Sequence, residues 1–247
     1  MNNNYPYIIE TENLFFKYPD GTLALQDINI AIPAGSCQAF LGGNGAGKST
    51  LFFNLNGLFR PCEGRILWQG QPLAYDKASL SRLRSLVGII LQDPNDQLFS
   101  ANVYQDISFG ALNLGLDEKE VRRRVDAAME DCGISHLAGK ATHALSFGQK
   151  KRVAIAGTLV MEPQLLILDE PTAGLDPMGV QELMKLLNDI RSHRGATIAI
   201  STHDIDLVPL YCDNVYLLHE GKIISQGSPD EIFANPELLR SKNLRLP

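Results

Sequence analysis

The sequence has no long apolar segment, no basic excess and no secretory leader. No apolar run approaches the roughly 18 residues that a membrane-spanning helix needs. There are 22 Lys and Arg residues against 28 Asp and Glu, and the resulting net charge of −6 argues against nucleic acid as the main partner. The segment Met1 to Glu10 lacks the basic start and apolar stretch of a signal peptide. These absences predict an intracellular protein without membrane helices of its own.

Cysteine is scarce as well. The four cysteines, Cys37, Cys62, Cys132 and Cys212, lie far apart and form no C-x-x-C pair. Buried, reduced thiols fit this spacing better than a zinc site or a disulfide framework. The five histidines do not have the spacing of metal ligands either. We therefore expect this chain to hold no metal other than one that accompanies a substrate.

The residues that are present indicate a globular α/β protein. Hydrophobic residues make up 45% and charged residues 20%, which excludes a disordered chain. At about 150 residues per domain, 247 residues correspond to one large domain or one domain with an appendage. Strand-like and helix-like segments alternate, with a helical insertion near 100–160. We predict a single domain spanning 1–247.

Hydrophobic patterning locates the main elements. Apolar residues alternate with polar or small ones at Ile28, Ile30 and Ile32, which is typical of a half-buried strand. The continuous apolar runs 165–168 and 197–200 are typical of parallel strands covered on both faces. Further strands are predicted over 8–40, 64–73, 86–91 and 215–225, and helices over 48–58, 117–132, 180–190 and from Ser228 onward, where Glu231 completes a capping box.

A glycine-rich segment between a predicted strand and a predicted helix has the spacing of a phosphate-binding loop. Gly42 to Ser49 fits G-x-x-x-x-G-K-[ST]. Glycines let the backbone N–H groups wrap around phosphates, and the following helix turns its positive end toward the same anion. The alternative is a glycine-rich turn that binds no ligand, but such a turn would need neither this spacing nor a place between a strand and a helix. We predict a nucleoside triphosphate site made by Gly42, Asn44, Gly45, Ala46, Gly47, Lys48, Ser49 and Thr50, in which Lys48 reaches the phosphates and Ser49 ligates Mg²⁺.

The apolar strand 165–168 ends in two carboxylates. Asp169 and Glu170 follow it directly, about 120 residues after the P-loop. An acidic pair at a strand end is common by chance, but behind a P-loop it indicates the second half of a nucleotide site. We predict that Asp169 holds Mg²⁺ through its water shell and that Glu170 is the base for the attacking water.

The segment Leu145-Ser146-Phe147-Gly148-Gln149 separates this chain from other P-loop proteins. It resembles the signature sequence of ATP-binding cassette (ABC) ATPases. Ser146, Gly148 and Gln149 at a helix start can form a second anion site, although Ser146 alone could be an ordinary N-cap. A phosphotransferase on the same P-loop would not need this segment.

Four further residues match the ABC pattern in order, and the resemblance covers about residues 8–227. Three of them also have a plain structural interpretation: Tyr18 as a strand aromatic, Asp176 as an N-cap and His203 as a structural histidine. The resemblance implies that Tyr18 stacks on adenine and that Gln92 senses the γ-phosphate, ligates Mg²⁺ and contacts the membrane partner. It also implies that Asp176 communicates across a dimer and that His203 contacts the γ-phosphate and orients the attacking water.

The resemblance also implies an architecture and partners. It implies a RecA-like P-loop core sheet, an N-terminal antiparallel β-subdomain, an inserted helical subdomain at about 95–160 and a short C-terminal tail at about 228–247. Two cassettes would pair head to tail, each lending its signature segment to the other's P-loop. The second cassette is either the same chain or a paralogue. A soluble ABC ATPase acting on DNA or ribosomes usually has two cassettes or a long coiled-coil insertion, which this chain lacks.

Other segments resemble the ATPases of energy-coupling-factor (ECF) importers, which take up vitamins, cobalt or nickel. These segments are Gln92–Ser100 and Asp106–Leu116, while Phe147 with Lys150–Arg152, and Asp204–Tyr211, resemble the cobalt-type members. The resemblance implies a transmembrane coupling subunit, a substrate-binding membrane subunit and a location at the cytoplasmic face of the membrane. Cobalt is the expected cargo, with nickel or a vitamin as alternatives. Gly43 and Phe147 depart from the commonest family residues, but neither change removes a phosphate ligand.

Two apolar residues stand in a polar stretch directly after Gln92. Leu98 and Phe99 follow a segment rich in Asp, Asn and Gln. Apolar anchors within a polar rim suit the docking of a partner helix. The alternative is that both residues pack into the helical subdomain. We predict that they dock the membrane partner.

Overall fold

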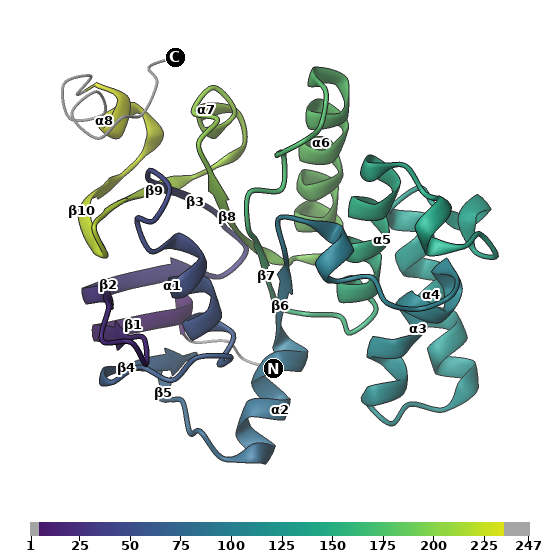
Figure 1. Cartoon of the computed structure of the whole chain (residues 1–247), viewed down its shortest axis with the longest axis horizontal. Helices are drawn as coiled ribbons and strands as arrows, with labels where there is room; N and C mark the ends of the chain where they lie inside the picture. Colours follow the sequence, from purple (N-terminus) through teal and green to yellow (C-terminus); the bar gives the residue numbers. More distant parts are fainter. Residues whose placement is uncertain (1–4, 235–247) are drawn as a thin grey trace.

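The computed structural model describes residues 5–234 and contains two β-sheets and a helical region (Figure 1). The predicted C-terminal tail, 228–247, is described only as far as residue 234. None of the helices in this described part is both long and apolar enough to cross a membrane.

The first sheet is the antiparallel subdomain that the resemblance implied. Its strand order is β2-β1-β4-β5. Ile28, Ile30 and Ile32 are all buried, so the alternation in the sequence correctly predicts the inward face of β2. The strands are β1 (Tyr7–Lys17), β2 (Leu23–Pro33), β4 (Glu63–Trp68) and β5 (Gln71–Pro72).

The second sheet has the order β10-β9-β3-β8-β7-β6, and only β10 is antiparallel to its neighbour. The segments that follow β3, β6, β7 and β8 therefore emerge at one edge, where open α/β sheets bind ligands. The strands are β3 (Cys37–Leu41), β6 (Val87–Ile90), β7 (Leu165–Leu168), β8 (Thr197–Thr202), β9 (Asn214–His219) and β10 (Lys222–Gly227).

Two hydrophobic clusters cover the faces of this second sheet. Phe40, Leu165 and Ile167 pack on the cluster shared with the antiparallel sheet, while Leu166 and Leu168 pack on the cluster shared with the helical region. Alternate residues of β7 thus enter different cores, and this explains its continuous apolar sequence. The helices outside the helical region are α1 (Lys48–Leu55), α2 (Lys77–Leu86), α6 (Pro177–Arg194), α7 (Val208–Tyr211) and α8 (Pro229–Phe233).

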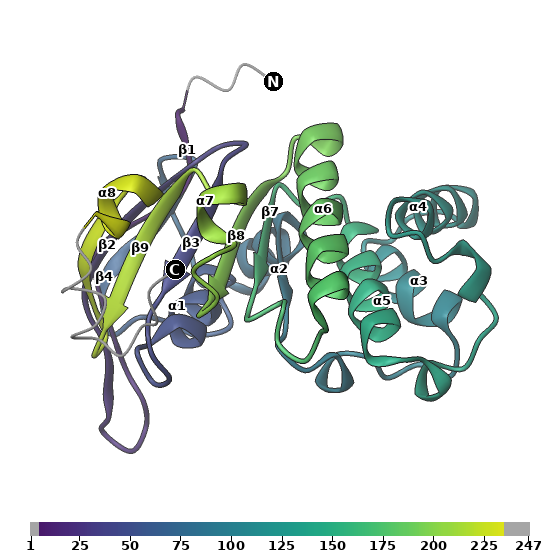
Figure 2. The ribbon, with the colours of Figure 1, turned by 90° about the horizontal axis from the view of Figure 1, so that it is seen from above.

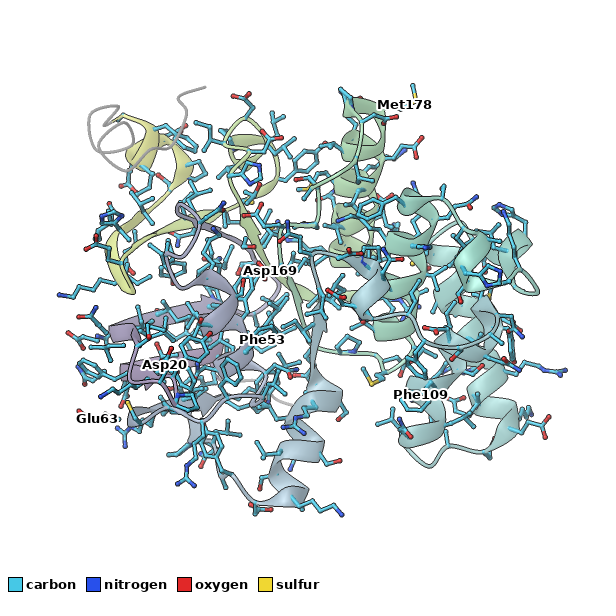
Figure 3. All side chains as sticks on the ribbon, viewed as in Figure 1. Asp20, Phe53, Glu63, Phe109, Asp169 and Met178 are labelled. Atoms are coloured by element: carbon cyan, nitrogen blue, oxygen red, sulfur yellow. The ribbon has the colours of Figure 1, made fainter. Side chains whose placement is uncertain are left out.

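The helical region lies at the opposite end of the molecule from β1 and β2 (Figure 2). Val121, Val125 and Met129 are buried, as their helical spacing predicts. The region comprises α3 (Val103–Asn113), α4 (Glu118–Asp131) and α5 (Phe147–Leu159). Figure 3 shows Asp169 near the middle of the molecule and Phe109 on the outer part of α3. The sequence-based fold class is therefore confirmed, except that the helix predicted over 48–58 already ends at Leu55, where the chain turns at Asn56 and Gly57.

Candidate functional site

The loop between β3 and α1 wraps around the start of that helix. Gly47 caps α1 with φ of 104°, and no side chain caps the helix there. A Cβ on Gly47 would lie 2.9 Å from the carbonyl oxygen of Ala24, so a larger residue would push the loop off β2. The N–H groups at the start of α1 are thus left to an anion, which the helix dipole also favours.

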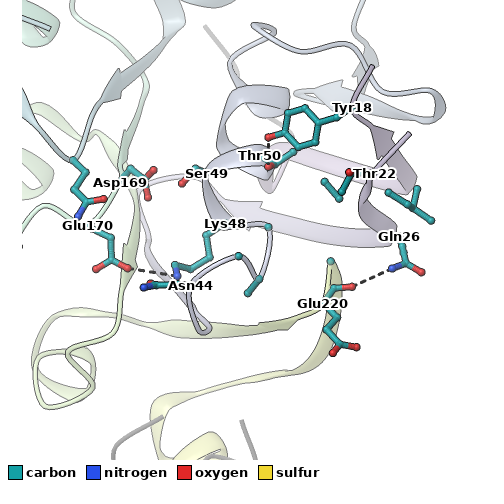
Figure 4. Close-up of a pocket in the computed structure, with 17 residues that line it drawn as sticks. Tyr18, Thr22, Gln26, Asn44, Lys48, Ser49, Thr50, Asp169, Glu170 and Glu220 are labelled. Atoms are coloured by element: carbon teal, nitrogen blue, oxygen red, sulfur yellow. Dashed lines mark hydrogen bonds and ion pairs between the residues drawn. The ribbon is translucent and has the colours of Figure 1, made fainter. Parts of the chain in front are cut away.

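A cleft of about 470 Å³ opens in front of this helix start (Figure 4). It brings together most of the predicted nucleotide residues. Those that line it are Tyr18, Asn44, Gly45, Ala46, Gly47, Lys48, Ser49, Thr50, Gln92, Asp169 and Glu170. Gly42 does not line it, but its carbonyl oxygen accepts a hydrogen bond of 2.7 Å from Lys48 Nζ.

Lys48 is 7% exposed and contacts several acceptors at once. Besides Gly42, its Nζ lies 3.3 Å from the carbonyl oxygen of Gly43 and 3.5 Å from Glu170 Oε1. A buried ammonium group is stable only when such partners offset its desolvation. Lys48 is therefore a concentrated positive charge in the cleft, beside the positive end of α1.

A serine of the neighbouring strand holds the Asp169 carboxylate and the Glu170 backbone at the end of β7. Ser201, which is fully buried in β8, donates to Asp169 Oδ1 at 2.5 Å and accepts the Glu170 N–H at 2.8 Å. Glu170 has φ of 45°, a left-handed conformation that non-glycine residues seldom adopt. Strain of this kind, on the order of 1–3 kcal/mol, persists where surrounding contacts hold it and is concentrated at functional sites.

His203 reaches the cleft through Glu170. Its Nδ1 lies 2.7 Å from Glu170 Oε2, while the side chain of His203 is 67% exposed and that of Glu170 only 9%. Glu170 is thus held on both oxygens, by Lys48 and by His203. The structure brings these three predicted catalytic residues into direct contact.

Tyr18 stands at the other end of the cleft. Its hydroxyl lies 2.8 Å from Thr50 Oγ1, and its ring packs edge-on against Phe16 and Phe59 at centroid distances of 5.1 and 5.9 Å. The ring is therefore held rigidly beside the helix that follows the P-loop. Tyr18 lies one residue past the end of β1, and its ring offers a surface on which a base can stack.

Gln92 is the second residue after the end of β6, and a lysine joins its backbone to α5. The buried Lys151 donates from Nζ to the Gln92 carbonyl oxygen at 3.2 Å. Burial lowers the pKa of Lys151 to about 8, and the charges of Asp93 and Glu170 act in the opposite direction. Gln92 itself is exposed and its side chain lines the cleft.

The signature residues do not line this cleft. Ser146 is exposed and forms a capping box with Gln149 at the start of α5, in which Ser146 Oγ accepts the Gln149 N–H at 3.3 Å. Gly148 lies in the first turn of the same helix. Asp176 caps α6 and accepts the Gly179 N–H at 2.7 Å. Both capping roles that the sequence allowed for Ser146 and Asp176 are present.

The structure separates the two predicted docking residues. Phe99 is 65% exposed and meets Phe109 edge-on at 4.8 Å, and Phe109 is itself 48% exposed. Leu98 instead packs partly buried against the core of the helical region. Both line a groove of about 320 Å³ between β6 and the helices. The packing alternative therefore applies to Leu98 and not to Phe99.

Sequence reasoning missed several residues of the site. Ser201 follows the apolar run of β8 as its penultimate residue, a position that could have marked it, but a single serine has no spacing pattern. The tip of the β9–β10 hairpin also reaches the cleft, because the Gly221 N–H donates to the Ala46 carbonyl oxygen at 3.0 Å. The remaining lining residues that motif spacing does not identify are Thr22, Leu23, Ala24, Gln26 and Glu220.

Known proteins resemble this chain over most of its length. Residues 25–173 match the ABC transporter family. The energy-coupling factor transporter ATP-binding protein EcfA2 of Clostridium perfringens (strain SM101 / Type A) is 59% identical over 241 residues, which are 98% of this chain and 85% of that protein. EcfA of Methanocaldococcus jannaschii is 52% identical over 241 residues, again 98% of this chain and 86% of that protein.

A solved structure is similarly close. It is that of cbiO1 from Clostridium perfringens, part of the ABC transporter complex cbiONQ, and it matches with a TM-score of 0.87 at 59% identity over 98% of this chain and 96% of that one. The similarity extends over both sheets and the helical region. The chain therefore belongs to the ABC transporter family and, within it, to the ATP-binding subunits of energy-coupling-factor transporters, which are ATPases that couple hydrolysis to transport.

Proposed function

We propose that the cleft holds ATP with its phosphates on the P-loop and that Glu170 is the general base for hydrolysis. The observation that carries this proposal is the contact of Lys48 Nζ with Glu170 Oε1, 3.5 Å apart, beside the start of α1. A cation and a helix N-terminus attract phosphate oxygens. A carboxylate next to them can accept the proton of an attacking water.

The chemical step divides among three residues. The water oxygen bonds to the γ-phosphorus while the bond from phosphorus to the β–γ bridging oxygen breaks, and the water proton passes to Glu170. Lys48 offsets the negative charge on the phosphate oxygens. His203 holds Glu170 through the 2.7 Å contact and keeps an exposed ring that can reach the γ-phosphate.

The oxygen donors in the cleft suit Mg²⁺. Ser49 supplies a hydroxyl, Gln92 an amide and Asp169 a carboxylate, and all three line the cleft. Mg²⁺ prefers oxygen ligands and is commonly held by one or two carboxylates together with substrate phosphates and water. We propose that Ser49 and Gln92 ligate the ion and that Asp169, oriented by Ser201, holds its water shell. When bound, the ion would neutralise charge on the β- and γ-phosphates.

The signature segment is proposed to act on the nucleotide of a second cassette, a copy of this chain or a paralogue. Ser146 and Gly148 stand at an exposed helix start outside their own chain's cleft, which supports this role. Asp176, at the start of α6, is proposed to communicate across the same contact. In a head-to-tail pair, each α5 N-terminus would then face the other cassette's γ-phosphate.

The groove between β6 and the helical region is proposed to dock a helix of the membrane coupling subunit. Its exposed pair Phe99 and Phe109 supports this role, together with the position of Phe99 seven residues after Gln92 in the cleft. Large aromatic anchors carry much of the energy of helix-in-groove contacts. The segment from Gln92 to Phe99 would thus contact both the nucleotide and the membrane partner. The chain would lie at the cytoplasmic face of the membrane.

Cobalt is the proposed cargo, with nickel and vitamins as the alternatives. The preference rests on the resemblance of Phe147 with Lys150–Arg152, and of Asp204–Tyr211, to cobalt-type members. The similarity to cbiO1, part of the complex cbiONQ, supports the same branch of the family. The residues that choose the cargo would belong to the substrate-binding membrane subunit.

The proposed function is tested in cells that carry the complete transporter. Lys48→Ala should abolish both ATP turnover by the complex and uptake of radioactive cobalt, because it removes the buried cation from the phosphate site. Cobalt uptake indifferent to Lys48, beside vitamin uptake that depends on it, would refute the cargo but not the ATPase role.

The docking groove is tested separately. Phe99→Ser should keep the ATPase folded and able to bind ATP but reduce its co-purification with the membrane subunits. Leu58→Ser is the matched control, since Leu58 is also exposed, at 56%, but lies outside the groove. If Phe99→Ser assembles as well as Leu58→Ser, the groove is not the docking site.

A further inference from the structure

Lys151 is a buried lysine that none of the proposed roles uses. It lies in the first turns of α5, is 3% exposed, and donates from Nζ to the Gln92 carbonyl oxygen at 3.2 Å. This bond joins the backbone of the segment after β6 to the helix that carries the signature. Its neighbour Lys150 makes a second link to that segment, 2.7 Å from Nζ to Asn95 Oδ1.

Lys151 is buried, but its ammonium group has nearby partners. Its Nζ lies 5.2 Å from the centroid of the Phe147 ring, within the range of a cation–π contact. Burial lowers the pKa of Lys151, and the charges of Asp93 and Glu170 partly offset this by favouring the ammonium form. Burying an ammonium group is costly unless such partners are present, so the Gln92 carbonyl oxygen and the Phe147 ring are what make the buried position of Lys151 tolerable.

Phe147 extends the same chain of contacts to a third segment. Gly174 has φ of +77°, and a Cβ built there would lie 2.9 Å from a carbon of the Phe147 ring. Gly174 belongs to the turn that leads from Glu170 to Asp176 and α6. The turn before α6, the start of α5 and the segment after β6 therefore meet around Phe147 and Lys151.

We propose that Lys151 is a positioning residue that holds the Gln92 backbone against α5, so that the signature segment and Gln92 in the cleft are set in place together. The proposal rests on the proposed role of Gln92 at the γ-phosphate. The lysine side chain suits this task, because its four-carbon stem crosses from the helix and ends in donors that a carbonyl oxygen can accept.

The decisive variant is Lys151→Met. Methionine is also unbranched and has a similar volume, but it is apolar and has no N–H donors. Amide hydrogen exchange over residues 91–98 of the nucleotide-free protein should become faster, since the Gln92 carbonyl loses its partner. Steady-state turnover of ATP should fall about 10- to 100-fold in kcat, the scale of a misplaced active-site group. The Kd for ATP should stay within about twofold, because Lys151 does not line the cleft.

Three further variants make the test specific. Lys151→Arg keeps donors and charge and should restore most of the kcat and the slow exchange. Phe147→Leu removes the ring above Nζ and should move both readouts in the same direction by a smaller amount. Lys185→Met removes a charge from an exposed position on α6 and should change neither.

The outcomes separate this proposal from the one on which it rests. Unchanged exchange over 91–98 in Lys151→Met, or faster exchange with a normal kcat, overturns the positioning role. Should Lys151→Met fail to fold, Lys151→Arg and Phe147→Leu decide by the same readouts. Normal turnover in Gln92→Ala would remove Gln92 from the γ-phosphate site, and the functional part of this proposal with it, while faster exchange in Lys151→Met would still establish the link.

Discussion

Two helices of this protein begin at predicted phosphate-binding segments, and their first turns are built differently. At α1 the cap is Gly47, no side chain bonds to the free N–H groups, and Lys48 is buried beside them. At α5, Ser146 and Gln149 close a capping box on the helix's own N–H groups, and Ser146 is exposed. The start of α1 is thus a nearly complete anion site. The start of α5 satisfies itself and needs a second molecule to bring it a ligand.

This difference predicts that substitutions at the two helix starts impair nucleotide binding and hydrolysis in different ways. Changes around α1 should alter what an isolated chain binds or hydrolyses. Changes at α5 should be visible only when two cassettes meet. The variants below are ordered by the size of the expected effect.

The largest effect is expected for Glu170→Gln on the α1 side. The amide cannot take a proton from water, so kcat for ATP hydrolysis should fall by about 10²–10⁴-fold, the range for a lost general base. Binding of ATP should persist because Lys48 and the P-loop are unchanged. ATP would then remain between two cassettes, and size-exclusion chromatography should detect an ATP-dependent dimer.

His203→Ala is the informative companion of Glu170→Gln. It keeps the carboxylate but removes the 2.7 Å contact to Glu170 Oε2. If Glu170→Gln turned over ATP at a near-normal rate, Glu170 would not be the base. A slow His203→Ala beside it would then point to the histidine as the group that handles the proton.

Ser146→Arg tests the α5 side of the comparison. The long, charged side chain would stand where a partner's nucleotide is proposed to lie, so cooperative hydrolysis should fall by about 10²-fold, as for loss of one preorganised transition-state donor. The affinity of a monomer for ATP should be unchanged, because Ser146 lies outside its own cleft. Equilibrium binding at protein concentrations too low for dimerisation measures it. Weakened binding under these conditions would contradict the head-to-tail arrangement.

The sequence predicts the elements of this fold better than their arrangement. The alternation of Ile28, Ile30 and Ile32 locates β2, and the continuous run 165–168 locates a strand covered on both faces, because burial imposes these patterns locally. The order β10-β9-β3-β8-β7-β6 depends instead on crossovers between distant segments. Here the patterning already indicated the helical insertion near 100–160, whereas the antiparallel subdomain was supplied by the resemblance to ABC ATPases.

The residues of the site likewise fall into those that the sequence identifies and those that it does not. The P-loop and the Asp169-Glu170 pair can be found from spacing, because phosphate binding demands glycines and a lysine in fixed order. Motif spacing does not identify Ser201 or Lys151. Lys151 stands in the basic run Lys150–Arg152 and is buried only because of how α5 lies against the segment after β6. The roles of Ser201 and Lys151 depend on contacts that exist only in the folded chain.

Ser201→Ala tests how far Asp169 and Glu170, in the cleft beside α1, depend on the hydrogen bonds from Ser201. The change leaves Asp169 Oδ1 and the Glu170 N–H without their buried partner. Unmet buried polar groups cost about 1–3 kcal/mol each, and at about 2–4 °C per kcal/mol for a chain of this size the Tm should drop by several degrees. We also expect kcat to fall about tenfold, as positioning of Glu170 loosens.

Thr202→Ser is the control for Ser201→Ala, because it alters a buried hydroxyl-bearing residue at the next position of β8 and keeps the hydroxyl. It should leave kcat and Tm close to those of the unaltered protein. A Ser201→Ala variant with normal kcat would mean that β7 alone orients the two carboxylates.

The smallest effect is expected at Tyr18, the farthest part of the α1 side from the chemistry. Tyr18→Leu removes the ring proposed to stack on adenine, and loss of a stacking contact worth about 1 kcal/mol should raise the Kd for ATP about fivefold. Inorganic tripolyphosphate has no base, so its Kd should not change. Tyr18→Phe keeps the ring and removes only the 2.8 Å bond to Thr50, and it should bind ATP nearly as well as the unaltered protein. Isothermal titration with both ligands separates these contributions. If Tyr18→Leu weakened ATP and tripolyphosphate equally, the ring would be supporting the P-loop helix through Thr50 and the aromatic cluster, not binding the base.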